Sequence, residues 1–131
     1  MINNNFEENN IRFYNKYNEA LFFHREKKFK EAESCYLESI NINPYQLEPY
    51  INLGALFQEQ SKYDDAIKYY LKSLELDPNN PTSNNNLASI YIKLKNNTQA
   101  IKYYLKLVES EQDFRLYNHV GNLFQEEKDF Q

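Results

Sequence analysis

Hydrophobic side chains recur at three- and four-residue spacing through most of this chain, which is the spacing of one face of an α-helix. The pattern is clearest between residues 47 and 78, where two such stripes follow one another across a short polar turn. Asp64 and Asp65 lie where carboxylates favour a helix N-terminus, and Pro78 lies where a helix must end. This stretch therefore predicts two amphipathic helices joined as a hairpin. The stripes consist of Tyr50, Leu53, Gly54 and Phe57 in the first helix, and of Tyr63, Ala66, Ile67, Tyr70, Leu71 and Leu74 in the second.

The hairpin repeats along the chain with a period of 34 residues. Gly54 corresponds to Ala88 (88 − 54 = 34), and the sequence AIKYYLK occurs at residues 66–72 and again at 100–106. A fixed period of this length indicates helical repeats, each of which buries one face on the next. We predict an all-α chain of about three and a half helix-turn-helix repeats, with bounds near 13–46, 47–80, 81–113 and 114–131. The helices should begin near Ile11, in a repeat domain over 11–131, after an asparagine-rich lead-in at 1–10 that we expect to be disordered.

Composition narrows the partners that such a chain can have. The net charge is −4, and the lysines and glutamates are interspersed, whereas a nucleic-acid surface normally needs a clustered basic face. No apolar run approaches the roughly 20 residues that span a bilayer, and the first residues lack the features of a signal peptide. Cys35 is the single cysteine, so an intramolecular disulfide is excluded and a reducing compartment is favoured. We expect a cytoplasmic or nuclear protein with no nucleic-acid and no membrane partner.

The repeated residues resemble the signature of the tetratricopeptide repeat family, in which an aromatic–x₂–Leu–Gly–x₂–aromatic run precedes Ala, a second aromatic and Pro. The resemblance covers about residues 13–131 and implies a right-handed α-α superhelix whose first helices line a concave groove. Such grooves usually bind peptides or extended segments of partner proteins. The small residues Ala20, Gly54, Ala88 and Gly121 should lie where paired helices approach closely. The signature is carried by Tyr50, Leu53, Gly54, Phe57, Ala66, Tyr70 and Pro78.

Asparagines occupy one slot of successive first helices, at Asn18, Asn52 and Asn86 (52 − 18 = 34; 86 − 52 = 34), with His119 in the fourth slot. An asparagine amide both donates and accepts, so this asparagine ladder could bond the N–H and C=O groups of an extended peptide. The superhelical region of O-linked N-acetylglucosamine transferases is similar in this respect. Alternatively, these amides only stabilise neighbouring helices. Further groove candidates by register are Tyr14, Tyr17, Leu21, Ile51, Asn85, Ser89, Asn118 and Asn122.

The chaperone-binding members of the family use a lysine- and arginine-rich clamp for a terminal carboxylate. In this chain the corresponding slots hold Tyr17, Leu21, Thr82 and Asn86, so the clamp is absent. We therefore do not expect heat-shock chaperone tails as the ligand.

Nothing in the sequence points to catalysis, to a metal or to a cofactor. His24 and His119 belong to different repeats, and Cys35 precedes Tyr36 on a core helix, where a buried small hydrophobe is expected. No glycine-rich phosphate loop and no pair of His or Cys at metal-ligand spacing occurs. We predict that the chain is not an enzyme and has no cofactor.

Three functions fit these predictions. The first is a non-catalytic scaffold that binds an extended peptide or a partner helix in its groove. The second is the substrate-recruiting segment of a larger enzyme, such as an O-linked N-acetylglucosamine transferase-like glycosyltransferase, and the third is an architectural subunit of a large assembly. Val120, Leu123 and Phe124 of the last predicted helix should lack a covering second helix. Either the chain is therefore a fragment of a longer protein, or this face associates with another copy.

Overall fold

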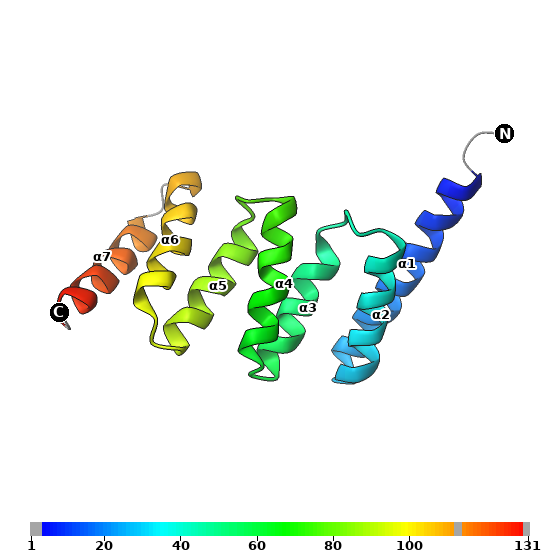
Figure 1. Cartoon of the computed structure of the whole chain (residues 1–131), viewed down its shortest axis with the longest axis horizontal. Coiled ribbons are helices and arrows are strands. Elements are labelled where there is room, and N and C mark those ends of the chain that lie inside the picture. The colour runs from blue at the N-terminus through cyan, green and yellow to red at the C-terminus, as the bar shows by residue number, and fades with distance from the viewer. Residues whose placement is uncertain (1–3, 112–113, 130–131) are drawn as a thin grey trace. The chain divides into compact units, whose positions relative to one another are not determined.

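The computed structural model describes residues 4–111 and 114–129, and side chains over 4–109 and 118–129. Within these residues the chain consists of seven α-helices and no strand, which confirms the all-α prediction (Figure 1). Each predicted repeat contributes a first helix and, up to the third repeat, a second. The helices are α1 (Asn4–Arg25), α2 (Phe29–Ile42), α3 (Glu48–Glu59), α4 (Tyr63–Leu76), α5 (Pro81–Lys93), α6 (Asn97–Glu111) and α7 (Phe114–Asp129).

The turn inside each hairpin is built in the same way. Lys27, Ser61 and Lys95 have φ values of 59°, 58° and 58°, in the left-handed region where a helix commonly ends. The following amide bonds back to the last turn of the helix, as Lys62 N does to Phe57 O at 2.9 Å. None of the three residues is a glycine, so each turn carries the steric cost of a side chain at positive φ.

The helices form two compact units, one ending at Tyr69 and the other beginning at Tyr70 within α4. In unit 1, α1 packs on α2 and α2 packs on α3. In unit 2, α5 packs on α6 and α6 packs on α7. Burial of aromatic and aliphatic side chains stabilises each unit by roughly 1.5–3 kcal/mol per large side chain. The most buried large side chains are Tyr36, Leu53 and Leu56 in unit 1, and Tyr70, Leu87 and Ile90 in unit 2.

The start of α1 differs from the prediction that the helices begin near Ile11. The helix begins at Asn4, so residues 4–10 of the expected lead-in are helical. Their side chains are exposed, except that Asn10 is half-buried. Periodicity failed to find these residues because they bury no apolar stripe and only extend a helix that is anchored further along by Phe13 and Ala20.

The last helix also corrects two predictions. Val120 and Leu123 are 5% and 3% exposed, so the expectation that they lack cover is wrong, and Phe124 alone is exposed, at 53%. Their burial accompanies the packing of α7 on α6. Gly121 was expected at a close helix approach, yet a Cβ added there would meet no atom within 4 Å. Ala20 and Ala88 are fully buried, as predicted.

Candidate peptide-binding faces

One stripe of α1 side chains forms half of a candidate site in unit 1. Tyr14, Tyr17 and Leu21 follow one another at helical spacing, and His24 and Arg25 continue the same stripe. Tyr14 is 50% exposed, and Tyr17, Leu21 and His24 are half-buried. The other half comes from α3. We call the set Tyr14, Tyr17, Leu21, His24, Arg25, Asn52 and Glu59 the α1–α3 face.

The first link across this face joins Asn52 to Tyr17. Asn52 Nδ2 donates to the Tyr17 hydroxyl at 2.8 Å, and the Tyr17 ring stacks on Phe13 with centroids 5.9 Å apart. Burial raises the pKa of Tyr17, and the bond from Asn52 only partly offsets this rise, so the hydroxyl keeps its proton at neutral pH. The predicted alternative role of the asparagine, a bond between neighbouring helices, is therefore present. The same bond also holds the amide plane of Asn52 in one orientation.

The second link lies two helical turns further along and was not predicted. Glu59 accepts bonds from His24 Nε2 at 2.9 Å and from Lys27 Nζ at 3.0 Å. His24 Nδ1 lies 3.0 Å from the hydroxyl of Tyr36, so this imidazole connects α1, α2 and α3. Burial by itself would raise the pKa of Glu59, but the bonds from His24 and Lys27 outweigh it and leave the pKa below its usual value.

Burial and nearby negative charge raise the pKa of Tyr36, so its hydroxyl stays protonated. Because a carboxylate only accepts, His24 Nε2–H donates to Glu59, while His24 Nδ1 lies against the Tyr36 hydroxyl. A cavity of about 490 Å³ opens at this second link, lined by Leu21, His24, Arg25, Lys27 and Glu59.

In unit 2, Asn86, which corresponds to Asn52, bonds a tyrosine of a second helix instead of one of a first helix. Asn86 Nδ2 donates to the hydroxyl of Tyr70 at 3.1 Å. His119 lies with its ring edge-to-face on Tyr104, with centroids 4.8 Å apart. Among the described side chains, the remaining predicted groove residues form no hydrogen bond to another helix. Of these, Asn18, Asn85, Asn118 and Asn122 are exposed, and Ile51 and Ser89 are half-buried.

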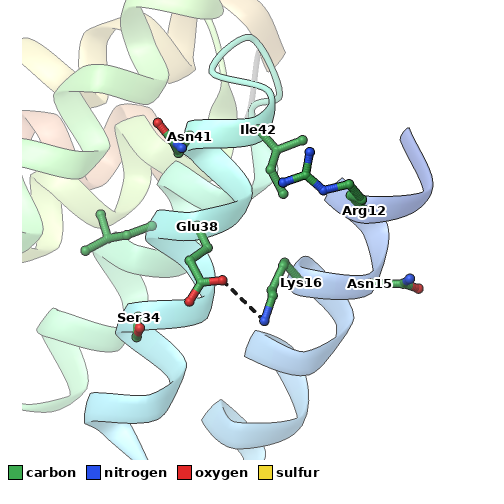
Figure 2. Close-up of a pocket in the computed structure, with 8 residues that line it drawn as sticks. Arg12, Asn15, Lys16, Ser34, Glu38, Asn41 and Ile42 are labelled. Atoms are coloured by element: carbon green, nitrogen blue, oxygen red, sulfur yellow. Dashed lines mark ion pairs between the residues drawn. The ribbon is translucent and has the colours of Figure 1, made fainter. Parts of the chain in front are cut away.

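A second cavity of unit 1, of about 520 Å³, lies between α1 and α2 (Figure 2). Figure 2 shows Lys16 of α1 directed at Glu38 of α2, at 3.2 Å, while Lys16 also pairs with Glu19 at 3.3 Å. The bonds to Glu38 and then to Glu19 raise the pKa of Lys16. Lys16 is thus paired with the chain's own carboxylates, whereas Arg12, which also lines this cavity, is exposed and donates to Asn9 Oδ1 at 3.5 Å.

Three further observations concern the candidate nucleophile, metal sites and membrane spans. Cys35 is 6% exposed and burial raises the pKa of its thiol, so it is a buried small side chain, as predicted. No three His, Cys, Asp or Glu side chains gather as a metal site in the part of the chain that the structure describes. In the same part, none of the helices has the length and apolar content that crossing a membrane requires.

The fold and these faces define a helical-repeat protein with polar links between neighbouring helices. Family models described as tetratricopeptide repeat match residues 14–46, 48–80 and 69–102. The chain belongs to the tetratricopeptide repeat family, as its signature residues predicted.

Solved structures of low sequence identity share the fold. The first TPR of Spaghetti (RPAP3) bound to HSP90 peptide SRMEEVD is 17% identical, with a TM-score of 0.75, and the match covers 87% of this chain and 91% of that chain. The N-terminal domain of stress-induced protein-1 (STI-1) from C. elegans is 16% identical, with a TM-score of 0.78 and coverage of 85% and 93%. The Arabidopsis OM64 TPR domain is 18% identical, with a TM-score of 0.76 and coverage of 90% and 98%. The comparison with curated proteins gave no match.

Proposed function

We propose that this chain is a non-catalytic protein-interaction module that binds an extended segment of a partner protein along its first helices. The family supports the class, and a similar fold binds an HSP90 peptide in the Spaghetti structure. That peptide is not transferred to this chain, because Tyr17 and Leu21 replace the clamp residues that the family resemblance implies.

The observation that carries the proposal is the anchored amide of Asn52. Its Nδ2 is bonded to Tyr17, and among the described residues no second bond engages its Oδ1 or its other amide hydrogen. A half-buried amide held in one orientation presents a donor and an acceptor to a peptide backbone at a reduced entropic cost. Asn86 offers the same arrangement through Tyr70. The proposed contacts are therefore Asn18, Asn52, Asn86 and His119, flanked by Tyr14, Tyr17, Asn85, Ser89 and Asn122.

The experiment separates the amide's two roles with paired variants. Tyr17→Phe removes the bond to Asn52 but keeps the amide, whereas Asn52→Ala removes both. Peptides selected by the wild-type chain from a random nine-residue library are titrated into each variant by fluorescence polarisation. If Asn52 contacts the ligand, Asn52→Ala weakens binding about three- to tenfold more than Tyr17→Phe, the loss expected for one to two hydrogen bonds. Equal Kd values for the two variants would remove Asn52 from the site.

Self-association through α7 is a separate proposal, and it now depends on Phe124 alone. At the same register, Phe57 stacks on Tyr69 at 5.6 Å and Tyr91 stacks on Tyr103 at 5.8 Å, while Phe124 is 53% exposed. A second copy could supply the missing cover. Size-exclusion chromatography over a hundredfold concentration range tests this: we expect a shift to dimer that Phe124→Ser abolishes, and a wild-type monomer at every concentration would refute it.

A further inference from the structure

The cavity at the second link of the α1–α3 face carries one uncompensated positive charge. Its lining contains Arg25 and Lys27 against the single carboxylate of Glu59 (+2 − 1 = +1, counted over Arg, Lys and Glu). Both oxygens of that carboxylate are already used, by His24 and by Lys27. Arg25 is exposed and forms no ion pair with any described carboxylate, and its neighbour Glu26 does not line the cavity. The guanidinium of Arg25 is thus open to an anionic group from outside the chain.

An apolar side chain lies beside this charge. Leu21 lines the same cavity, is half-buried, and precedes Arg25 by one helical turn, which is about 6 Å along α1. Toward the start of α1 the face continues through Tyr17 to Tyr14, whose ring is half exposed. A peptide that crosses Leu21 can therefore extend from the cavity toward Tyr14.

We infer that this cavity selects an extended segment in which an aspartate or glutamate side chain lies next to an apolar residue. The inference rests on the proposed function, since it names the chemistry of the ligand. The acidic side chain pairs with Arg25 and the apolar one packs on Leu21. The carboxylate comes from within the segment and not from its chain terminus.

The test uses the full chain and a random library of nine-residue peptides that are acetylated and amidated, so that no terminal carboxylate is present. The tightest-binding peptide is then compared with its Glu→Gln or Asp→Asn version, by fluorescence polarisation, on wild type and on Arg25→Gln. We expect the neutral peptide and the Arg25→Gln variant each to bind about three- to tenfold more weakly, with no further loss when they are combined. Arg12→Gln is the matched control, because Arg12 lies on the same helix but lines the cavity between α1 and α2.

The outcomes distinguish this inference from the proposed function. Selected peptides without an acidic preference, or an unchanged Kd for Arg25→Gln, would overturn the inference and leave the proposed function standing. Binding that appears only when the amidated end is replaced by a free carboxylate would overturn the internal source of the acid. Absence of any binder both from this library and from the same library with free carboxyl ends would refute the proposed function itself. Circular dichroism of Arg25→Gln, which alters an exposed residue at the end of α1, confirms that any loss is not a loss of fold.

Discussion

The same tyrosine of the second helix has different partners in the two units. In unit 2, the Tyr70 hydroxyl accepts the amide of Asn86. In unit 1 the corresponding hydroxyl, Tyr36, lies against His24 Nδ1, and the corresponding amide, Asn52, donates to Tyr17.

One substitution between repeats accounts for the change at the amide. One period after Tyr17 the chain has Ile51 (17 + 34 = 51), which carries no hydroxyl. Asn52 can therefore bond a tyrosine of α1, whereas the residue that corresponds to this tyrosine one period later has no hydroxyl for Asn86. In both units a tyrosine hydroxyl anchors the asparagine amide, but the tyrosine comes from a different position of the repeat.

The largest contrast is expected at the two glycines. Gly54 is buried in unit 1, and Gly54→Leu should lower the free energy of unfolding by about 1–3 kcal/mol through overpacking. At Gly121 the space around an added Cβ is open, so Gly121→Ala should instead raise it by about 0.5–1 kcal/mol, since alanine favours a helix. Urea unfolding of both variants measures the difference. Equal destabilisation at the two sites would contradict the packing described for α7.

A second contrast is expected at two buried serines one period apart. Ser39 Oγ donates to Tyr36 O at 2.7 Å and Ser73 Oγ donates to Tyr70 O at 2.6 Å, but Ser73 also accepts from the hydroxyl of Ser83. Ser73→Ala leaves the buried Ser83 hydroxyl without its acceptor and should cost about 1–2 kcal/mol. Ser39→Ala leaves no other side chain without its partner, so the free energy of unfolding should hardly change. Thermal unfolding by calorimetry compares the two, and a cost at Ser39 as large as at Ser73 would count against the Ser73–Ser83 bond.

A third effect concerns the anchoring bond of unit 1. Tyr17→Phe removes the hydroxyl that receives Asn52 and should lower the free energy of unfolding by about 0.5–1.5 kcal/mol. Ile51→Val, a half-buried change that touches no described hydrogen bond, is the control. Chemical denaturation followed by tyrosine fluorescence gives both values. No loss in Tyr17→Phe would mean that the bond between α1 and α3 contributes nothing to stability.

The smallest effect is pH-dependent and belongs to unit 1. Glu59 is partly exposed, so its pairing with His24 and Lys27 should contribute about 0.2–1 kcal/mol. Its pKa is lower in the folded than in the unfolded chain. The contribution is therefore complete above the unfolded value of 4.5 and disappears as the pH falls through the folded value.

Unfolding of wild type and Glu59→Gln between pH 3 and pH 7 measures this contribution. The two stabilities should differ near neutrality and converge in acid. A difference that grows as the pH falls would have the wrong sign.

Most of the fold could be predicted from the sequence, because each helix has its own hydrophobic stripe and the same stripes recur in each repeat. The helical structure of residues 4–10 was not predicted, because a helix extension without a buried face leaves no periodic signal. The site was predicted only in part. Asn52 and Tyr17 were named, but their bond was not, since it depends on the neighbour across the repeat.

The sequence contains a signal for the second link. Tyr17 and Asn52 are separated by 35 residues, as are His24 and Glu59, so residues one period plus one apart meet on the α1–α3 face. Extending the Leu21 stripe by one turn and applying this separation would have found the second link. The separation does not predict that Arg25 lacks a carboxylate partner. That depends on the bonds that His24 and Lys27 form with the two oxygens of the nearby carboxylate.

The central claim is that the first helices bind an extended segment of a partner, and nuclear magnetic resonance tests it most directly. The tightest library peptide is titrated into ¹⁵N-labelled protein, and shifts are followed at the side-chain amide of Asn52 and at the backbone of Leu21 and Arg25. We predict saturable shifts at these positions and none at Arg12 or Leu37, which line the cavity between α1 and α2. Shifts confined to that second cavity, with the Asn52 amide unmoved, would contradict the account.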